Sequence, residues 1–594
     1  MSISIEEDLV SRWRADDLCS LWLRRIDRGD DGRVVSFWSR SERQLDPISQ
    51  HIFLRQALTL ADVLGESGVK AGVPAVIDCT TPRATLLAYV GTVFCGGLPL
   101  ITPIHMASRA PTSDRAVELH ARVGASCVIT DRTQPKDVPA ELSAFPAPRL
   151  VRINPLSFAP ATRIPSSVAP TGRASEVAHL QLTSGSTASP KATAVTHGNV
   201  LANCGAFSRM RGMSSEDSIV SWLPLYHDMG LVGMALLSLL QGTDLHMLSP
   251  FDFLAHPGDW LRAISTTGAA VTSSPTFGYR LAATRTSDAE RDSLDLSRLK
   301  VAACGGEPVR ADVLTLFTQR FTPCGLGNGV FQPCYGLAEA TLAVTFGVLH
   351  QQPSLILIAG SALDPSGKIS LVDVGRLGDT ANSTEYGPSH NLAIGNQHDL
   401  SNTQLLVSAG VPVAETEISI VDPDTGELRP AEDLCGEVVV RGPGVTPGFW
   451  QSGSVEPRAG TWLRTGDIGL IHRGELYLVE RSNNLLIRNG QNYPATALET
   501  SLATACGVDV DAVMVVDSDI HNPRKPPDRS PRSRPSHRPR PASRPSFSRR
   551  GPTGTSSRRR SRYPPRRLAT NIQWQKEARF APPSTPGPHP VYCR

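Results

Sequence analysis

The sequence of 594 residues has no long apolar run, no paired cysteine motif and very little lysine. No apolar segment approaches the roughly 18 residues that a bilayer-spanning helix needs, so we expect no stable membrane insertion. The 11 cysteines are scattered without a Cys-x-x-Cys pair, which argues against a zinc site and against a disulfide framework. The N-terminus, Met1–Asp8, is acidic where a secretory signal is basic, and we expect a cytoplasmic protein.

Charge is unevenly distributed along the chain, although the formal net charge is only +3. Residues 522–570 carry 15 Arg and one Lys against one acid, whereas residues 1–521 carry 40 basic and 54 acidic residues. An acidic body does not attract nucleic acid by its overall field. We therefore expect no nucleic-acid partner.

The composition changes after Ser518. Asn522–Arg567 is dominated by Pro, Arg and Ser, and it holds too few aliphatic side chains to offset the entropy of ordering. A basic arm that binds nucleic acid or a membrane is one interpretation of such a segment. The whole chain has only seven Lys, however, and reading GC-rich DNA out of frame yields Arg, Pro, Ser, Ala and Gly. We therefore interpret residues 518–594 as a disordered tail with a frameshifted or degenerate sequence.

Residues 1–478 alternate between helical and extended patterns, which predicts a layered α/β architecture with a largely parallel sheet. Helices are expected at Ile52–Gly68, Thr85–Cys95 and Gly230–Leu240, and strands at Ala75–Asp78, Cys127–Thr130, Val177–Leu182, Ser218–Leu223, Val301–Ala303, Glu437–Arg441 and 474–479. The Pro-, Ser- and Ala-rich residues Ala144–Arg173 predict a connection across the surface. The length exceeds what one core supports, so two or more domains are expected.

One short segment, Thr183–Lys191, holds five hydroxyl side chains, one glycine and a terminal lysine directly after a predicted strand. Hydroxyls and exposed backbone N–H groups bind polyphosphate oxygens, and glycine lets the backbone approach closely. The segment is not a P-loop, because Gly185 is its only glycine and the lysine comes last. A Ser/Thr-rich linker is the alternative interpretation.

The same segment resembles the phosphate-binding loop of the acyl-adenylate-forming superfamily, and other matches follow in the expected order. Gly305–Pro308 resembles the adenine-side turn, Tyr335–Glu339 the aromatic-plus-acid motif, and Thr465–Asp467 the ribose-binding motif. Arg481 together with Gly490 resembles the hinge region. The resemblance implies cofactor-binding roles for Thr183, Ser184, Gly185, Ser186, Thr187, Gly305, Gly306, Glu307, Pro308, Tyr335, Gly336, Asp467 and Arg481.

This resemblance also implies a fold and a domain organisation. A large, layered adenylate-forming N-terminal domain is expected at 1–478. Residues 479–517 would form the hinge and a truncated remnant of the small C-terminal domain, followed by the disordered tail at 518–594.

The reaction implied by the resemblance joins a carboxylate to the α-phosphate of ATP and expels pyrophosphate. Its transition state spreads charge over phosphate oxygens, so positioning and electrostatic stabilisation dominate catalysis. Lys191 would add a point charge, and Glu339 would hold Mg²⁺, which prefers one or two carboxylates plus phosphate oxygens. His227 stands where relatives receive the incoming carboxylate, although a lone histidine is more often structural. Lys191, His227 and Glu339 are thus the implied catalytic residues, with ATP and Mg²⁺ as cofactors.

Two of the implied nucleotide contacts, Tyr335 and Asp467, have purely structural alternatives. Tyr335 would offer a flat face to adenine, although an isolated tyrosine at a strand end is usually a buried aromatic. Asp467 would accept hydrogen bonds from the ribose hydroxyls, whereas an aspartate in a turn commonly caps the turn. Arg481 always carries charge and would reach the ribose or a phosphate.

Four segments look most like fatty acyl-AMP ligases: Tyr226–Leu231, Phe253–Ser265, Gln332–Thr341 and Arg488–Pro494. The resemblance covers about residues 30–517. It implies a long-chain fatty acid as substrate and transfer of the acyl group to an acyl carrier protein of a polyketide or lipopeptide assembly line. The apolar segments Leu231–Leu240 and Ser274–Tyr279 would line an acyl tunnel, pack in the core, or do both.

Two other functions stay open. A fatty acyl-CoA synthetase belongs to the same superfamily but uses CoA as acceptor. A catalytically inactive nucleotide- or acyl-binding remnant is the second alternative, and the end of the chain favours it. Relatives carry a late lysine in a mobile C-terminal domain, whereas Lys525 lies in a Pro/Arg run, Lys576 lies in Gln-Trp-Gln-Lys-Glu, and Ser482–Asn484 replaces charged hinge residues.

Overall fold

The computed structural model describes residues 17–103, 122–132, 149–168, 174–183, 191–359, 366–378, 403–429, 432–488, 491–495 and 498–499. All of these residues belong to one unit, Met1–Val513. The tail predicted at 518–594 lies outside the described residues, and the domain boundaries at 478 and 517 stay predictions. Helices and mixed sheets alternate along the described chain, which confirms the predicted α/β class.

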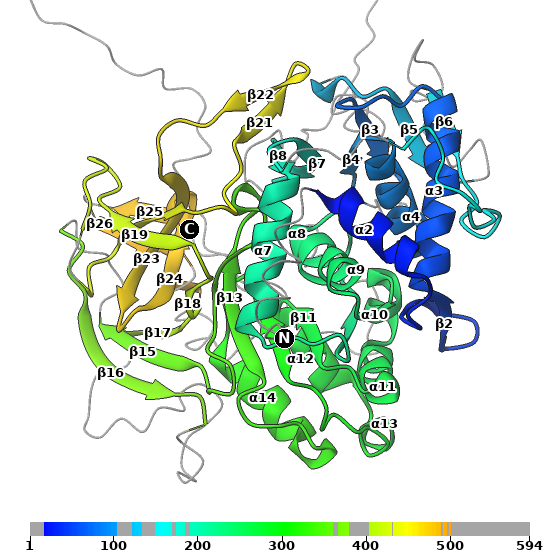
Figure 1. Ribbon diagram of the computed structural model, residues 1–594. Helices are drawn as coiled ribbons and strands as arrows, with labels where there is room; N and C mark the ends of the chain where they lie inside the picture. The colour runs from blue at the N-terminus through cyan, green and yellow to red at the C-terminus, as the bar shows by residue number, and fades with distance from the viewer. Residues whose placement is uncertain are drawn as a thin grey trace, which may run out of the picture. The chain divides into compact units, whose positions relative to one another are not determined.

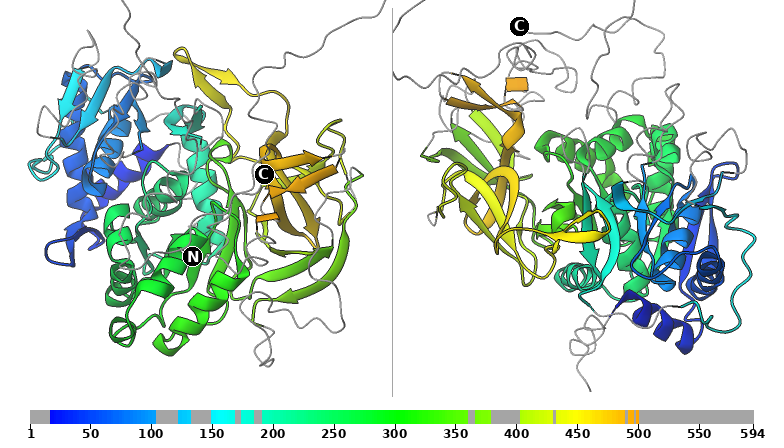
Figure 2. Two further views of the ribbon diagram at one scale, coloured as in Figure 1. Left: turned by 180° about the vertical axis from the view of Figure 1, so that it is seen from behind. Right: turned by 90° about the horizontal axis from the view of Figure 1, so that it is seen from above.

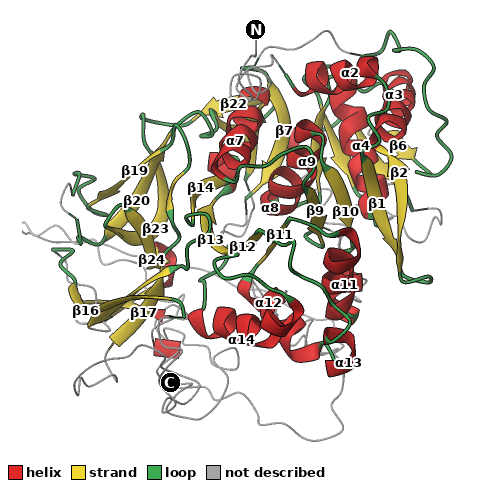
Figure 3. Ribbon diagram, turned by 60° about the horizontal axis from the view of Figure 1, so that its bottom comes forward, coloured by secondary structure: helices red, strands yellow, loops and turns green. Residues whose placement is uncertain are grey.

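The larger of the two main sheets has a parallel centre. In spatial order its strands are β18 (Val411–Pro412), β14 (Ala343–Phe346), β13 (Phe331–Gly336), β12 (Val301–Cys304), β11 (Val271–Ser274), β9 (Ser218–Ser221), β10 (Asp244–Met247), β1 (Val34–Ser39) and β2 (Gln44–Ser49). The strands from β13 to β1 pair in parallel, and antiparallel strands close both edges. Figure 3 shows β9 to β13 side by side, with their connecting helices beside them. The carboxyl ends of the parallel strands therefore meet at one edge.

The second main sheet carries the predicted phosphate loop. Its strands are β22 (Ser454–Pro457), β21 (Gly448–Gln451), β8 (Ala192–Thr196), β7 (Val177–Leu182), β4 (Leu98–Ile101), β3 (Pro74–Ile77), β5 (Cys127–Thr130) and β6 (Arg149–Arg152). The strands predicted at Cys127–Thr130 and Val177–Leu182 are confirmed with the same bounds. The prediction of a plain connection at Ala144–Arg173 is wrong in part, because β6 lies within it and pairs in parallel with β5. Only Leu150 and Val151 are apolar in β6, too short a signal to stand out in a Pro-rich stretch.

Helices cover these sheets and connect their strands. They are α2 (Leu18–Arg28), α3 (Gln50–Glu66), α4 (Pro82–Phe94), α7 (His197–Met210), α10 (Pro250–Ala255), α11 (Pro257–Thr267), α12 (Thr276–Arg285), α13 (Asp288–Arg291) and α14 (Ala311–Phe321). Helix α4 lies beside α3, as Figures 1 and 2 show in blue, and its residues Ala84–Phe94 are all buried. It begins where the Thr81 hydroxyl accepts from the Ala84 N–H, with Pro82 in the first turn.

The apolar segment Gly230–Leu240 is a buried helix, as predicted, but not a uniform one. It consists of a short α8 (Asp228–Gly230), a π-helical turn η2 (Leu231–Leu236) and α9 (Leu237–Gln241). All residues of η2 and α9 are buried in the main core. Single π-helical turns are frequently found at functional sites, and this one begins four residues after His227. The apolar pattern alone could not distinguish it from a regular helix.

Smaller sheets follow the large ones in the chain. They consist of β15 (Ser354–Ala359), β16 (Ser370–Arg376) and β17 (Thr403–Val407); of β19 (Glu417–Val421), β20 (Gly436–Arg441), β23 (Leu463–His472) and β24 (Glu475–Arg481); and of the hairpin β25 (Leu485–Arg488) and β26 (Gln491–Pro494). The strands predicted at Glu437–Arg441 and 474–479 correspond to β20 and β24. Strand β24 runs across residue 478 and ends at Arg481.

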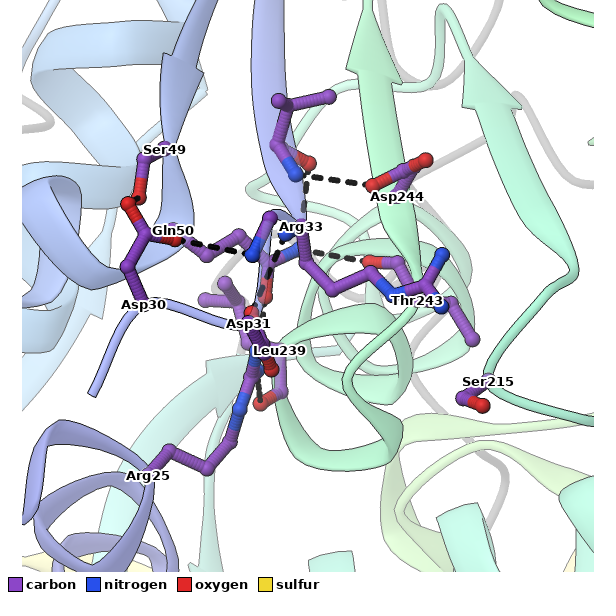
Figure 4. Close-up of polar contacts among 12 residues, drawn as sticks. Arg25, Asp30, Asp31, Arg33, Ser49, Gln50, Ser215, Leu239, Thr243 and Asp244 are labelled. Atoms are coloured by element: carbon purple, nitrogen blue, oxygen red, sulfur yellow. Dashed lines mark hydrogen bonds and ion pairs between the residues drawn. The ribbon is translucent and has the colours of Figure 1, made fainter. Parts of the chain in front are cut away.

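A polar network joins α2 and α3 to the segment between α9 and β10 (Figure 4). Gln50 is fully buried, donates from Nε2 to the Thr243 carbonyl at 2.6 Å and accepts from Arg25 Nη1 at 2.7 Å. Arg25 also donates to the Leu239 carbonyl at 2.9 Å and pairs with Asp31 at 2.9 Å. The network satisfies polar groups that the surrounding core would otherwise leave without partners.

Gln50→Leu is expected to lower the free energy of unfolding by about 1–3 kcal/mol, because Arg25 Nη1 loses one of its two acceptors and the carbonyls of Thr243 and Val34 lose the Gln50 amide as donor, although the Ser238 hydroxyl still donates to Thr243. Urea denaturation measures the change. Gln44→Leu is the matched control, since Gln44 is exposed on β2. Equal losses in both variants would contradict the prediction.

Candidate active site

Several of the predicted site segments meet at the carboxyl edge of the nine-stranded sheet. Strand β9 leads into Pro224–Gly230, β12 leads into the turn at Gly305, and β13 ends at Tyr335 and Gly336. These strands lie in one parallel stretch of the sheet. Ligands of open α/β sheets bind in the crevice outside this edge. We therefore assign the candidate active site to it.

Asp467 is the centre of the clearest polar cluster. Tyr335 Oη donates to Asp467 Oδ2 at 2.6 Å, and Arg481 Nε lies 3.1 Å from Asp467 Oδ1. Tyr335 and Asp467 are each only 6% exposed, and β23 pairs with β24 so that Asp467 stands opposite Arg481. We call these three residues the Asp467 cluster. An ionised carboxylate has about four acceptor positions, so two remain for other donors, such as a pair of ribose hydroxyls.

The Asp467 cluster has distinct protonation properties. Burial raises the pKa of Asp467, and the Arg481 charge with the Tyr335 hydrogen bond offsets only part of that rise. Burial and the Asp467 charge also raise the pKa of Tyr335 well above its ordinary value, so the phenol stays a neutral donor.

An irregularity in the pairing of β23 with β20 explains the Thr-Gly-Asp sequence, which lies inside β23. Thr465 Oγ1 donates to the Val438 carbonyl at 2.8 Å and accepts from the Asp467 N–H at 3.1 Å. Gly466 has a φ of +74°, which disfavours other residues, and its N–H donates to Glu437 at 3.0 Å. These contacts hold the backbone that carries the Asp467 side chain. Glu437 was missed by the sequence analysis, since an acid inside a strand carries no local signal of this role.

The adenine-side turn is tightly packed. A Cβ on Gly305 would lie 2.5 Å from the Cys334 carbonyl oxygen, and Gly306 has a φ of +81°. Glu307 accepts from the Phe277 N–H at 2.8 Å, and the Pro308 carbonyl accepts from Thr276 Oγ1 at 3.3 Å. The turn is therefore fixed to the start of α12. The glycines allow the backbone to approach β13 closely.

Glu339 lies in a 3-10 turn, η4 (Ala338–Ala340), just after β13. Gly336 makes the intervening turn possible, because a Cβ there would lie 2.0 Å from the Leu342 carbonyl oxygen. Burial raises the pKa of Glu339, and the negative charges of Asp228 and Asp467 add to the rise. The site is thus rich in acidic charge, which a cation would stabilise. No ready-made group of three metal-ligating side chains occurs among the described residues.

His227 and Asp228 form an ion pair at the start of α8. His227 Nδ1 lies 2.8 Å from Asp228 Oδ1, and the His227 side chain is partly exposed. Burial disfavours charge on this imidazole, but the Asp228 charge and hydrogen bond outweigh burial and raise the pKa of His227. The sequence analysis assigned Asp228 no role, and an aspartate at a helix start commonly serves as a cap.

The phosphate-loop candidates are only partly placed. Ser184, Gly185, Ser186 and Thr187 lie outside the described residues, as does Gly490. Thr183 and Lys191 form the base of the loop, where the Thr183 N–H donates to the Lys191 carbonyl at 3.0 Å. Lys191 Nζ lies 4.8 Å from the ring centre of Phe449 on β21. Within the described part of the chain, its ammonium contacts this ring and none of the acids of the site.

The apolar candidates for an acyl tunnel pack in the core. Leu231–Leu240 is buried throughout, and Trp222 stacks on Phe253 with ring centres 3.9 Å apart. Tyr279 is fully buried and donates to the Ala303 carbonyl at 2.8 Å. The predicted core packing is confirmed, and a tunnel stays a prediction. A cavity of about 20 Å³ lies beside the site, lined by Pro82, Thr85, Ile101, Leu223, Pro224, Leu225, Tyr226 and Pro250.

Tyr335→Phe is expected to weaken Mg·ATP binding about 3- to 10-fold, because the ring face remains while Asp467 loses a hydrogen bond that orients it. Isothermal calorimetry measures the affinity. Tyr477→Phe is the matched control, since Tyr477 is another buried tyrosine and lies on β24, the strand that pairs with β23 of Asp467. An unchanged affinity in Tyr335→Phe would show that the hydroxyl is dispensable.

The fold is that of an α/β protein in which Tyr335, at the carboxyl end of the parallel strands, meets Asp467 and Arg481 of the antiparallel strands β23 and β24; open α/β sheets bind ligands outside that edge. The family of AMP-binding enzymes matches residues 48–376 and 348–450, and the chain belongs to this family. The superfamily resemblance seen in the sequence is thereby confirmed.

None of the helices in the described part of the chain combines the length and apolarity that a bilayer crossing requires.

Named relatives narrow the comparison. The 4-hydroxyphenylalkanoate adenylyltransferase of Mycobacterium tuberculosis is 34% identical over 357 residues, which are 57% of this chain and 53% of that enzyme. This chain thus spans about half the length of that relative. The putative fatty-acid–CoA ligase fadD25 of the same organism is 29% identical over 492 residues, 78% of each chain. A Legionella pneumophila fatty acyl-adenylate ligase, solved with acyl adenylate and pyrophosphate, superposes with a TM-score of 0.67 at 27% identity, covering 81% of this chain and 79% of that one.

Proposed function

We propose that this protein is a fatty acyl-AMP ligase that activates a long-chain fatty acid with ATP, giving acyl-adenylate and pyrophosphate. The observation that carries the proposal is that the Asp467 cluster and Asp228, the partner of His227, both lie close enough to Glu339 to act on its charge. These groups offer acceptors for a ribose, an acid for a cation and a histidine for a carboxylate. The likeness to the Legionella fatty acyl-adenylate ligase supports the same assignment.

The residues fit ATP with Mg²⁺ as cofactors. Asp467 has acceptor capacity left for the ribose hydroxyls, and Tyr335 presents an aromatic ring beside it. Glu339 would be the protein ligand of Mg²⁺, with phosphate oxygens completing the shell, since its raised pKa reflects burial and unbalanced negative charge. Bound Mg²⁺ would neutralise part of the negative charge of the phosphates. Lys191 and the hydroxyls of the phosphate loop would hold the β- and γ-phosphates.

The acceptor of the acyl group is proposed to be an acyl carrier protein of a polyketide or peptide synthase. TtuA of Teredinibacter turnerae, named a medium-chain-fatty-acid–[acyl-carrier-protein] ligase, is 30% identical over 57% of this chain and 51% of its own length. A cytoplasmic location is part of the same proposal.

Pyrophosphate exchange tests the proposal. The panel contains medium- and long-chain fatty acids and a 4-hydroxyphenylalkanoate, because one relative carries that substrate in its name. We expect pyrophosphate exchange to be faster with the fatty acids than with the 4-hydroxyphenylalkanoate. A chain that binds Mg·ATP but exchanges with no acid would instead be an inactive remnant.

A fatty acyl-CoA synthetase is the second candidate, and the name of fadD25 favours it. Mass spectrometry with ATP, a fatty acid and either CoA or a carrier protein separates the two. We expect acyl-adenylate and acylated carrier protein. Abundant acyl-CoA without accumulating acyl-adenylate would reverse the choice.

A further inference from the structure

Asp228 is a buried carboxylate with two close partners. It is 7% exposed, and its Oδ1 lies 2.8 Å from His227 Nδ1. The same oxygen accepts from the Met229 N–H at 2.7 Å. A buried carboxylate is costly unless it is paired and hydrogen-bonded, so these contacts explain why it is tolerated. They also influence which ring nitrogen of His227 carries a proton.

Two acceptors compete for the Met229 N–H. Its nitrogen lies 2.7 Å from Asp228 Oδ1 and 3.3 Å from His227 Nδ1. The shorter contact is to the charged acceptor, and the same Asp228 oxygen lies 2.8 Å from His227 Nδ1, an ion-pair distance that favours a proton on this nitrogen. In a histidine protonated at Nδ1, Nε2 is an acceptor when the ring is neutral and a donor only when the ring is charged.

The backbone holds His227 firmly in this position. Its N–H donates to the Pro224 carbonyl at 3.1 Å, and its carbonyl accepts from Gly230 and Leu231 at 3.1 and 2.9 Å. A Cβ on Gly230 would lie 2.4 Å from the Pro224 carbonyl oxygen, so the loop closes as tightly as a glycine permits. The backbone position of His227 is therefore fixed, and Asp228 orients its imidazole ring.

We infer that Asp228 is a positioning residue that holds His227 as an imidazolium, whose Nε2–H receives the carboxylate of the substrate. The inference rests on the proposed function, because it requires a carboxylate substrate at His227. A carboxylate offers only acceptors, so a neutral ring protonated at Nδ1 would present a lone pair to it. The imidazolium supplies both a donor and a positive charge.

The surrounding charges support the charged ring. Asp228 raises the pKa of His227 despite burial, and its charge also reaches Glu339 on η4, Cys334 on β13 and His179 on β7. Burial raises the pKa of the Cys334 thiol to about 12 and lowers the pKa of His179 to about 3, so both are neutral near pH 7. Glu339, the remaining member of this group, adds negative charge when ionised. Asp228 is thus the group whose charge favours the imidazolium.

Asp228→Asn tests the inference, because asparagine keeps an oxygen that accepts the Met229 N–H while removing the charge. The histidine ring signals are followed by NMR against pH, with the His227 signal assigned from the spectrum of His227→Gln. We expect the His227 midpoint to move to lower pH in Asp228→Asn. The KM for the fatty acid should rise about tenfold at neutral pH, while the KM for ATP stays within about twofold.

Asp217→Asn is the matched control. Asp217 is a similarly buried carboxylate, 5% exposed, which precedes β9 at the opposite end of the strand and pairs with Lys300 at 2.7 Å. It should leave the His227 midpoint unchanged, whatever its effect on stability.

Two results would overturn the inference. One is an unchanged His227 midpoint in Asp228→Asn, and the other is a parallel rise of the KM for ATP and for the fatty acid. The titration decides the pairing even if the wild type adenylates no acid. Failure of this inference and failure of the proposed function are therefore distinguishable.

Discussion

Asp467→Ala is expected to weaken Mg·ATP binding by about 1–3 kcal/mol, or roughly 5- to 150-fold. The reason is geometric, because Asp467 is held by Tyr335 at 2.6 Å and by Arg481 at 3.1 Å with acceptor capacity to spare. Removing the carboxylate leaves ribose hydroxyls without acceptors and Arg481 without its partner. Isothermal calorimetry on the full chain measures the loss.

Asp433→Ala is the matched control for this experiment. Asp433 pairs with His472 at the far end of β23, at 2.7 Å, so its removal changes the same sheet without touching the cluster. ATP affinity should be unchanged in Asp433→Ala. Equal affinities in wild type and Asp467→Ala would remove Asp467 from the nucleotide site.

The pH dependence follows from the same cluster. Because burial raises the pKa of Asp467, its protonation begins at higher pH than for an ordinary aspartate as the solution is acidified. A protonated carboxyl loses acceptor capacity, so ATP binding should weaken as pH falls through that pKa and reach a plateau above it. Asp467→Asn should lack this limb of the profile.

Much of the fold was predictable because its signals are local. β5 and β7 have the predicted bounds, since short apolar runs next to turn residues define buried strands. Strand β6 was not predictable, because its apolar content is two residues and its pairing with β5 supplies the rest. The π-helical turn at Leu231–Leu236 was equally hidden, because every residue in it is buried and the apolar pattern has no period to read.

The site residues likewise differ in whether local sequence or long-range pairing determines their contacts. Tyr335 and Asp467 could be proposed separately from motif order, but their hydrogen bond joins residues 132 apart and depends on strand pairing. The direction of Lys191 was also out of reach, because it depends on β21, which returns from residue 448 to pair with β8. Long-range pairing, and not residue type, decides these contacts.

Replacing the residues after Asn484 with the in-frame small domain of a relative is expected to raise pyrophosphate exchange about 10²–10³-fold. That is roughly the effect of one preorganised group on a charged transition state. The motivation is the composition after Ser518, where Lys525 and Lys576 stand in contexts unlike the family's late lysine. The junction is suitable, because Ser482–Asn484 forms an exposed 3-10 turn after β24.

The matched control is the same chimera with the late lysine of the relative changed to Ala. This control keeps the added domain and removes only the charge, so it should lose most of the gain. A gain that survives in the control would assign the effect to domain packing and not to the lysine. If the present chain already exchanges pyrophosphate as fast as the chimera, the interpretation of residues 518–594 as degenerate is wrong. The body would then complete its charge stabilisation with residues it already has, and Arg481, whose Nε lies 3.1 Å from Asp467, would be the first to replace.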